Sequence, residues 1–361
     1  MRSSSRAHPR TRREHFIALF PSAPAFRLKQ VAQALFQEGA EGWQDITTFP
    51  ASMREALMRD VPWMSVSEAA LRESKRGDTF KAVLKTADGL VFETVLMANA
   101  RDQWTVCVSS QIGCAMRCTF CATGAMGLRR SLTEDEIVDQ LRFWRVFLRS
   151  RPHLPERISN VVFMGMGEPL ANYENVKSAI RTWLACTDLG PTHVTVSTVG
   201  VLPQMEALLT DRDWPAVRIA ISLHSADQKR REEIVPSTVP DFLVKLADWS
   251  RRYVQILGNR RHHLTFEYTL LQGVNDTEEV ARGLGTFIRK TGVKKLNVIP
   301  WNPVSGKAFA QSTQERIDRF KAVVSSFGID VTQRHSMGED IAAACGQLAT
   351  AHSGDPSPRE E

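Results

Sequence analysis

Three cysteines lie close together in the segment CAMRCTFC, which runs from Cys114 through Cys118 to Cys121. A structural zinc site needs four ligands and usually pairs two Cys or His hairpins, and the chain has no second hairpin of that kind. Three thiolates suit a [4Fe-4S] cluster better, because they leave one iron with an open position. The spacing therefore favours an iron–sulfur cluster that binds a further ligand, with zinc as the alternative.

The other three cysteines, Cys107, Cys186 and Cys345, are scattered along the chain. From the residues alone, Cys345 in DIAAACGQL is typical of an inert cysteine in a helical core. Three cysteines packed into one segment do not resemble the evenly spaced framework of a secreted disulfide protein. We therefore expect a reducing, cytoplasmic location.

After Trp104 the sequence alternates six times between an apolar strand and an amphipathic helix. This alternation predicts a parallel sheet with outer helices. Six units are two short of a complete (β/α)8 barrel, so a partial barrel and a doubly wound sheet both fit the pattern. The expected strands and helices alternate as 105–111, 133–148, 158–167, 174–185, 193–200, 202–210, 217–224, 242–257, 263–271, 277–291, 295–303 and 313–328.

Most of the unusual residues follow these strands: the cysteine cluster, then GMGEP, STVG, SLHS, QGVND and WNP. In parallel α/β folds the carboxyl ends of the strands carry the functional site. The distribution predicts one catalytic mouth at that end of the sheet.

The remaining segments divide the chain into four expected parts. Residues 1–25 are rich in arginine and predict a flexible basic arm, with an organellar presequence as the alternative. Residues 26–98 contain helices and then strands around an Asp88-Gly89 turn, which indicates a small α+β accessory domain. Residues 99–350 form the barrel, and residues 351–361 are expected to be a disordered tail.

The composition restricts the partners. A net charge of +6 and a pI near 9.1 agree with a polyanionic partner such as nucleic acid. The longest apolar runs, residues 158–167 and 217–225, are strand-sized and far short of the ~20 residues that a spanning helix needs. We therefore expect no membrane segment.

Seven segments together resemble the RlmN/Cfr family of radical S-adenosylmethionine (SAM) RNA adenine methyltransferases. The resemblance extends from Phe26 to Ala349 and implies a partial (β/α)6 radical SAM barrel with a small N-terminal α+β accessory domain. The matching segments, in order, are CVSSQIGCAMRCTFCATGAMGLRRSLTEDEIVDQ, FMGMGEPLANYENV, VTVSTVG, AISLHS, FEYTLLQGVND, LNVIPWNP and DIAAACGQLA.

The resemblance implies two cofactors, one [4Fe-4S] cluster per chain and SAM. Cys114, Cys118 and Cys121 correspond to the cluster ligands, and SAM would take the open position on the fourth iron. The implied SAM contacts are Gly167 and Glu168 in GMGEP, Ser197 in STVG, Ser222, Leu223 and His224 in SLHS, and Asn302 in WNP.

The resemblance also implies a covalent mechanism. Carbon 2 of adenine is electron-poor and cannot attack the methyl group of SAM, so one SAM methylates Cys345 and a second yields the radical that activates this methyl group. The methylene then adds to the adenine, and Glu93 corresponds to the family's proposed proton acceptor. Cys107 resolves the adduct through a transient disulfide with Cys345, and Cys186 has no corresponding role.

For the substrate, the resemblance implies adenine C2 of 23S rRNA in the peptidyl transferase centre and of tRNA 3′ of the anticodon. Cfr-like methylation at C8 is the alternative, since residues 236–240 and Met337-Gly338 depart from the common pattern. A radical SAM enzyme with another target and an iron–sulfur RNA-binding module are further alternatives. The expected partners are RNA and an electron donor such as flavodoxin or ferredoxin, and the expected state is a monomer.

Clustered arginines near the expected mouth are candidate phosphate contacts, although solvated helix faces account for such charges equally often. The target base would have to leave its stack to reach a buried cluster. The candidates are Arg117, Arg129, Arg130, Arg251, Arg252, Arg260 and Arg261. The accessory domain, residues 26–98, is the expected second RNA-contacting surface.

Overall fold

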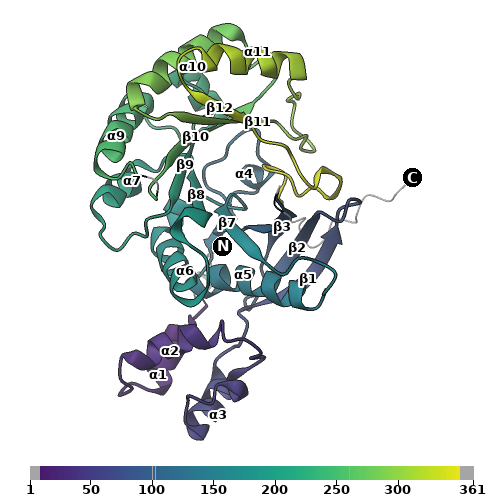
Figure 1. Ribbon diagram of the computed structural model, residues 1–361, viewed down its shortest axis with the longest axis vertical. Helices are drawn as coiled ribbons and strands as arrows, with labels where there is room; N and C mark the ends of the chain where they lie inside the picture. Colours follow the sequence, from purple (N-terminus) through teal and green to yellow (C-terminus); the bar gives the residue numbers. More distant parts are fainter. Residues whose placement is uncertain (1–8, 100, 102, 260, 350–361) are drawn as a thin grey trace, which may run out of the picture.

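The computed structural model describes residues 9–99, 101, 103–259 and 261–349. At its centre lies a run of seven parallel strands, and helices cover the outside of the curved sheet (Figure 1). The first six strands are each followed by a helix, which confirms the predicted partial (β/α)6 barrel. The units are β4 (Trp104–Cys107) with α5 (Glu134–Arg149), β7 (Ile158–Phe163) with α6 (Tyr173–Cys186), β8 (Val194–Thr198) with α7 (Leu202–Thr210), β9 (Arg218–Ser222) with α9 (Phe242–Ile256), β10 (Leu264–Leu270) with α10 (Glu278–Thr291), and β11 (Lys295–Pro300) with α11 (Gln314–Ser325).

The helices begin and end where their sequences dictate. The Thr133 hydroxyl caps α5 by accepting from the Glu136 N–H, and the Glu136 carboxylate accepts in turn from the Thr133 N–H. Gly292 ends α10 with a φ of 78°, which glycine adopts without steric cost. Inward-facing tryptophans such as Trp144 and Trp183 are fully buried between the helices and the sheet.

Three antiparallel strands extend the same sheet beyond β4: β1 (Val66–Glu73), β2 (Thr79–Thr86) and β3 (Val91–Ala98). Val95 on β3 lies opposite Cys107 on β4, so the pairing runs without interruption into the barrel. The predicted boundary at residue 98 is therefore wrong, because backbone pairing and a shared core join these strands to the barrel rather than to the helices before them.

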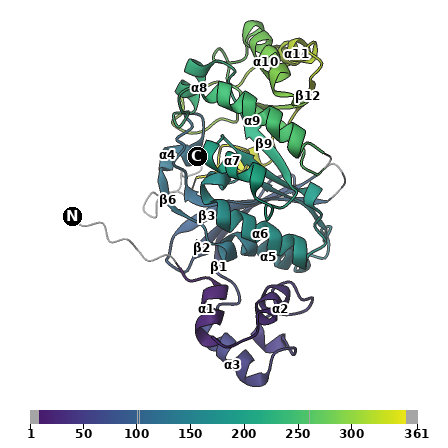
Figure 2. The same ribbon diagram turned by 90° about the vertical axis from the view of Figure 1, so that its left-hand side faces the viewer.

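The helices before the strands form a unit of their own at one end of the molecule (Figure 2). They are α1 (Arg12–Leu19), α2 (Phe26–Ala34) and α3 (Ala51–Asp60), packed around a core that contains Phe16 and Trp43. The prediction of a flexible arm through residue 25 is wrong for α1, because Phe16 is buried in this core. Residues 1–8 and the predicted tail 351–361 lie outside the described residues.

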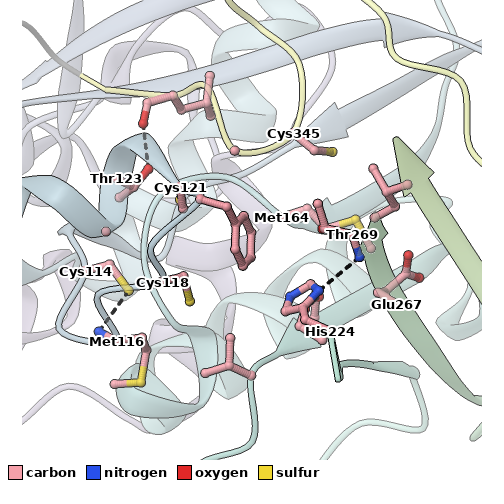
Figure 3. Close-up of a pocket in the computed structure, with 18 of the residues that line it drawn as sticks. Cys114, Met116, Cys118, Cys121, Thr123, Met164, His224, Glu267, Thr269 and Cys345 are labelled. Carbon is pink, nitrogen blue, oxygen red and sulfur yellow. Dashed lines mark hydrogen bonds between the residues drawn. The ribbon is translucent and has the colours of Figure 1, made fainter. Parts of the chain in front are cut away.

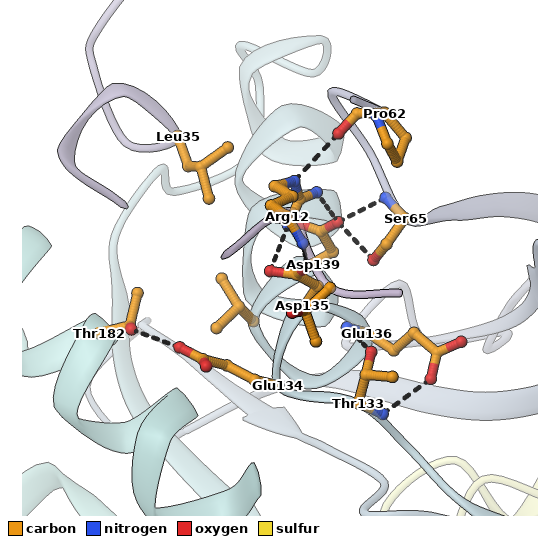
Figure 4. A network of polar contacts seen from close by, with 12 residues as sticks. Arg12, Leu35, Pro62, Ser65, Thr133, Glu134, Asp135, Glu136, Asp139 and Thr182 are labelled. Atoms are coloured by element: carbon orange, nitrogen blue, oxygen red, sulfur yellow. Dashed lines mark hydrogen bonds and ion pairs between the residues drawn. The ribbon is translucent and has the colours of Figure 1, made fainter. Parts of the chain in front are cut away.

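A buried polar network fixes the helical unit to α5 (Figure 4). The Arg12 guanidinium pairs with Asp135 and Asp139 of α5 and donates to the backbone oxygen of Pro62 at 3.0 Å. Asp139 also accepts from Arg142 at 2.6 Å. Since Arg12 and Asp139 are almost inaccessible to water, this network locks the helical unit to the barrel helix.

Several short elements were not predicted. A hairpin of β5 (Gln111–Gly113) and β6 (Leu128–Ser131) encloses the cysteine segment, together with α4 (Ala122–Met126). α8 (Gln228–Ile234) follows β9, and a last parallel strand, β12 (Asp330–Gln333), lies beside β11. The remaining elements are the 3-10 turns η1 (Trp43–Asp45), η2 (Pro169–Asn172), η3 (Pro191–His193) and η4 (Glu339–Ile341).

No helix in the described part of the chain is both long enough and apolar enough to cross a bilayer.

Candidate active site

The three clustered cysteines line one pocket at the carboxyl end of the parallel strands. The β5–β6 hairpin shapes their loop: the Cys114 N–H donates to the Gly127 oxygen at 3.1 Å, and the Cys121 N–H donates to the Cys118 oxygen at 3.2 Å. Arg117 within the loop has a φ of 56°, an unusual conformation for a non-glycine residue. The loop is thus held mainly by its backbone, and the Cys114 sulfur also accepts from the Met116 N–H at 3.5 Å (Figure 3). None of the three cysteines forms a disulfide.

The donor set fits a [4Fe-4S] cluster. Burial raises the pKa of the Cys114 thiol to about 12 and also raises that of Cys118, so a bound metal has to displace their protons. In the described residues no three His, Cys, Asp or Glu side chains converge closely enough to hold a single ion. Each thiolate of a cubane cluster binds a different iron, so the three sulfurs need not meet at one point.

The opposite wall of the pocket is formed by the ends of the next strands. Gly167 has a φ of 100°, and a side chain there would collide with Gln111, so only glycine fits. Glu168 is buried and accepts from the N–H groups of Leu170 and Val199, both at 2.9 Å. These two residues provide a backbone approach and a carboxylate, the groups that an ammonium of a ligand would need.

His224 presents a defined hydrogen-bond donor to the pocket. Its Nδ1 accepts from the Thr269 N–H at 3.1 Å, and burial, with a contribution from Arg231, lowers its pKa to about 3. The ring is therefore neutral, and its single proton must lie on Nε2. Phe120, the residue before the third cysteine, packs edge-on against this ring, with the two ring centroids 4.8 Å apart.

The remaining predicted SAM contacts occupy the same region with one exception. Ser197 and Ser222 line the pocket with their hydroxyls 3.2 Å apart, and Asn302 lines it as well. Leu223 is completely buried and is not among the lining residues, so its position suits packing or a backbone contact.

Cys345 also lines this pocket (Figure 3). It is far from the cysteine loop in the sequence, but the two segments lie next to each other in space. Asn302 Nδ2 donates to the Cys345 oxygen at 3.0 Å, and the Ala122 N–H donates to the Gly346 oxygen at 2.8 Å. Thr123 donates to the Leu348 oxygen at 2.6 Å. The segment forms no helix around Cys345, contrary to the helical core position that its residues alone suggest, and the residue is exposed.

Glu93 and Lys81 hold the two sides of this segment. Lys81 Nζ lies 3.2 Å from Glu93 Oε1 and donates to the Ala342 oxygen at 3.0 Å, while Glu93 Oε2 accepts from the Ala349 N–H at 2.9 Å. Glu93 is only 4% exposed, so it is not a surface glutamate. Burial raises its pKa despite the lysine, which suits a group that accepts a proton.

Cys107 lies behind the pocket wall at the end of β4. Burial first, and then a contribution from Cys345, raises the pKa of its thiol. Cys186 is the last residue of α6. It lines two surface grooves, and neither of them is this pocket.

The candidate arginines fall into two groups in the structure, those paired with acidic side chains and those that are exposed. Arg130 is engaged on both sides, by Asp88 and by Glu136, and thereby ties the β2–β3 turn to α5. Arg251 and Arg252 lie on α9, paired with neighbouring acids, on the outside of the barrel. Arg130, Arg251 and Arg252 therefore have structural explanations, because opposite charges already satisfy them. Arg117, Arg129 and Arg261 are exposed, and Arg260 lies outside the described residues.

Some residues of the site escaped prediction. Glu267 and Met164 line the pocket, and Arg334 reaches Glu267 at 3.5 Å from the segment after β12. Lys81 carried a usable signal, since it is a cation diagonal to Glu93 on the same face of the hairpin. Arg334 carried none, because the strand before it was not recognised.

A parallel partial barrel with three cysteines at its mouth defines the radical SAM class. The model of the Radical SAM superfamily matches residues 108–283. The structure superimposes on a radical SAM methyltransferase from Sphaerobacter thermophilus with a TM-score of 0.83 and 35% identity, covering 94% of this chain and 97% of that one.

Relatives with similar sequences indicate which family of radical SAM proteins the chain resembles. A probable dual-specificity RNA methyltransferase RlmN of Synechococcus sp. RCC307 is 40% identical over 92% of this chain and 93% of its own length. Another with this name, from Aquifex aeolicus, is 37% identical over 90% and 91%. The chain belongs to the RlmN family of radical SAM RNA methyltransferases. Its cofactors are accordingly a [4Fe-4S] cluster and SAM, as predicted.

Proposed function

We propose that the enzyme methylates C2 of an adenine in 23S rRNA, in the peptidyl transferase centre, and in tRNA, 3′ of the anticodon. The names of the relatives, dual-specificity RNA methyltransferases, support two RNA substrates. The observation that supports the covalent mechanism is the position of Cys345, which lines the pocket together with the three clustered cysteines. Glu93 accepts a hydrogen bond from Ala349 of the same segment.

Cys114, Cys118 and Cys121 would hold the cluster, and the strand ends from Gly167 to Asn302 would hold SAM. When bound, these cofactors supply the methyl group and the radical that activates it. The chain's own residues do the rest: Cys345 carries the methyl carbon and joins it to the base, and Glu93 accepts the proton that leaves the ring.

Cys107, as its thiolate, then attacks the Cys345 sulfur, and a disulfide forms as the carbon–sulfur bond to the RNA breaks. The carbon keeps the electron pair of that bond and takes up a proton, which completes the methyl group. An external thiol must reduce this disulfide before the next turnover, which agrees with a cytoplasmic location. We further propose a monomer that receives electrons from a flavodoxin or a ferredoxin.

The helical unit is the proposed second RNA-contacting surface. Arg10, Arg13 and Lys29 are exposed on it, and near the mouth Arg117 and Arg129 are exposed. Their charges can contact phosphates without reading sequence.

Mass spectrometry of adenosines tests the proposal. The purified enzyme, with its cluster, is incubated with rRNA or tRNA, SAM and a reductant, and 2-methyladenosine is the expected product. Finding 8-methyladenosine alone would instead establish the Cfr-like regiochemistry.

Substitution of the nucleophile tests the covalent route. Cys345→Ala should retain the visible absorbance of the cluster and lose RNA methylation, with Cys186→Ala as the matched control. Undiminished methylation by Cys345→Ala would refute the covalent mechanism.

A further inference from the structure

Arg231, on α8, is a completely buried cation with 0% exposure. Its guanidinium donates to three backbone oxygens: that of Val199 at 2.5 Å, that of Leu223 at 3.1 Å and that of Ser222 at 3.3 Å. Val199 and Ser222 line the candidate SAM pocket, whereas Arg231 does not. Arg231 thus lies directly behind the pocket wall and cannot touch a ligand inside it.

The other partners of this guanidinium are also uncharged. It donates to the Thr238 hydroxyl at 2.5 Å and stacks on the Phe242 ring at 3.8 Å. Within the described residues no carboxylate forms an ion pair with it. By contrast, the buried Arg12 and Arg142 both pair with Asp139. A buried charge without a counter-ion is costly, so a missing anion would explain why an arginine is present here.

The neighbourhood indicates where that anion would be. α8 ends against the cysteine loop, where the Thr119 N–H donates to the Ile234 oxygen at 2.9 Å. Cys118 and Ile234, the last residue of α8, belong to one buried cluster, so the helix that carries Arg231 packs directly against the cysteine loop. Glu168, on the same wall, directs its oxygens to Leu170 and Val199 instead.

We propose that Arg231 is the buried counter-charge of the iron–sulfur cluster and raises its reduction potential. The inference rests on the proposed assignment of Cys114, Cys118 and Cys121 as cluster ligands. Reduction adds one electron, from a low-potential donor such as dithionite, to a cluster that already carries thiolate charge. A fixed positive charge nearby stabilises the reduced form more than the oxidised form. Arg231 neither gains nor loses a proton in this step.

The test is a redox titration of the cluster, followed by electron paramagnetic resonance, without SAM or RNA. At a fixed potential, Arg231→Met should lower the ratio of reduced to oxidised cluster by about tenfold, which equals about 59 mV for one electron. Arg231→Lys keeps the charge and should stay within about threefold of the parent. Arg142→Met, at a buried arginine that is bound to Asp139 and not to the pocket wall, should leave the ratio unchanged.

Two results would overturn the inference. An unchanged potential in Arg231→Met would show that the charge does not act on the cluster. An equal shift in Arg231→Lys and Arg231→Met would show that the hydrogen bonds to the pocket wall matter, and not the charge.

A second measurement covers the case in which Arg231→Met folds poorly. Arg231→Gln keeps part of the hydrogen bonding, and its cluster should be lost to an iron chelator about tenfold faster than that of Arg231→Lys. Equal rates would contradict the proposal. A variant with all three cysteines changed to alanine separates the two hypotheses. If that variant still bound the cluster, the ligand assignment would fail, whereas a lost cluster there with a parental potential in Arg231→Met would refute only the role of Arg231.

Discussion

Lys81 Nζ lies 3.2 Å from Glu93 Oε1, and the two side chains hold opposite ends of the segment that carries Cys345. Both are almost fully buried, so neither can exchange its partner for water. The pair holds the segment that carries the proposed nucleophile, and it keeps Glu93 against this segment, next to but not among the residues that line the pocket.

Loss of Lys81 should release this segment. Lys81→Met leaves Glu93 as an unpaired buried charge and should destabilise the fold by about 3 kcal/mol. Hydrogen exchange of residues 342–349 should accelerate, and RNA methylation should fall at least tenfold. Lys85→Met, an exposed lysine on the same strand, is the matched control. Unchanged exchange in Lys81→Met would show that the segment is held by other contacts.

The cysteine loop should tolerate no side chain at Gly124. A Cβ there would lie 2.8 Å from the Cys118 oxygen and 3.0 Å from its nitrogen, both backbone atoms that cannot move aside. Gly124→Ala should therefore reduce the iron content of the reconstituted enzyme severalfold. Gly283→Ala on α10 has open space and should stabilise the protein by about 0.5–1 kcal/mol with full iron content. Full iron content in Gly124→Ala would contradict the loop geometry.

The docking of the helical unit should depend on Arg12. Arg12→Met leaves Asp139 with fewer partners, and proteolysis between the helical unit and β1 should become faster, with the exposed Arg13→Met as control. Equal cleavage of the two variants would argue against an anchoring role.

Acid should weaken this docking only at low pH. Burial raises the pKa of Asp139, but Arg12, Arg142 and Ser65 outweigh it and lower the pKa to about 2. Its stabilisation is complete above about pH 4 and is lost as the pH falls from there through about 2. Proteolysis can monitor the docking. If it showed that docking is already lost at pH 6, the lowered pKa of Asp139 would be contradicted.

His224 should make stability depend on mild acid. Its pKa is lowered to about 3, so below the ordinary value of about 6.5 the unfolded chain binds a proton that the folded chain does not. The free energy of unfolding should fall as the pH drops from 6.5 toward 3, by up to about 1.4 kcal/mol per pH unit. Urea unfolding at pH 6 and pH 5 should show a shallower dependence for His224→Gln than for the exposed control His193→Gln. Identical slopes would show that His224 is not held neutral.

The sequence predicted those parts of the fold that follow from local pattern. Alternation of apolar strands and amphipathic helices located all six βα units, because hydrophobic periodicity is local. It could not show that β3 pairs with β4, since register across strands depends on the whole sheet. The short β12 and the helix α1 were missed because neither has a long periodic pattern, and α1 is held chiefly by the contacts of Phe16 and Arg12 with other elements.

The site shows the same division. Cys114, Cys118 and Cys121 were found from spacing, whereas Cys345 could be connected to them only through the family resemblance. The segment QKRREEI was not predicted as a helix and contains several charges, and only the three-dimensional structure shows that Arg231 is buried without an acid. Burial of a polar side chain is set by distant segments, so local sequence cannot reveal it.

The hydrogen bonds from Lys81 to Ala342 and from Ala349 to Glu93 join residues 261 and 256 positions apart. Contacts across such long stretches of chain form late in folding, because loop closure costs entropy before the contacts repay it. The pocket takes Cys345, Gly346 and Leu348 from this segment, so the pocket is complete only after the segment has docked. A chain that has not yet closed these two long loops therefore has neither the finished pocket nor a docked Cys345 thiol.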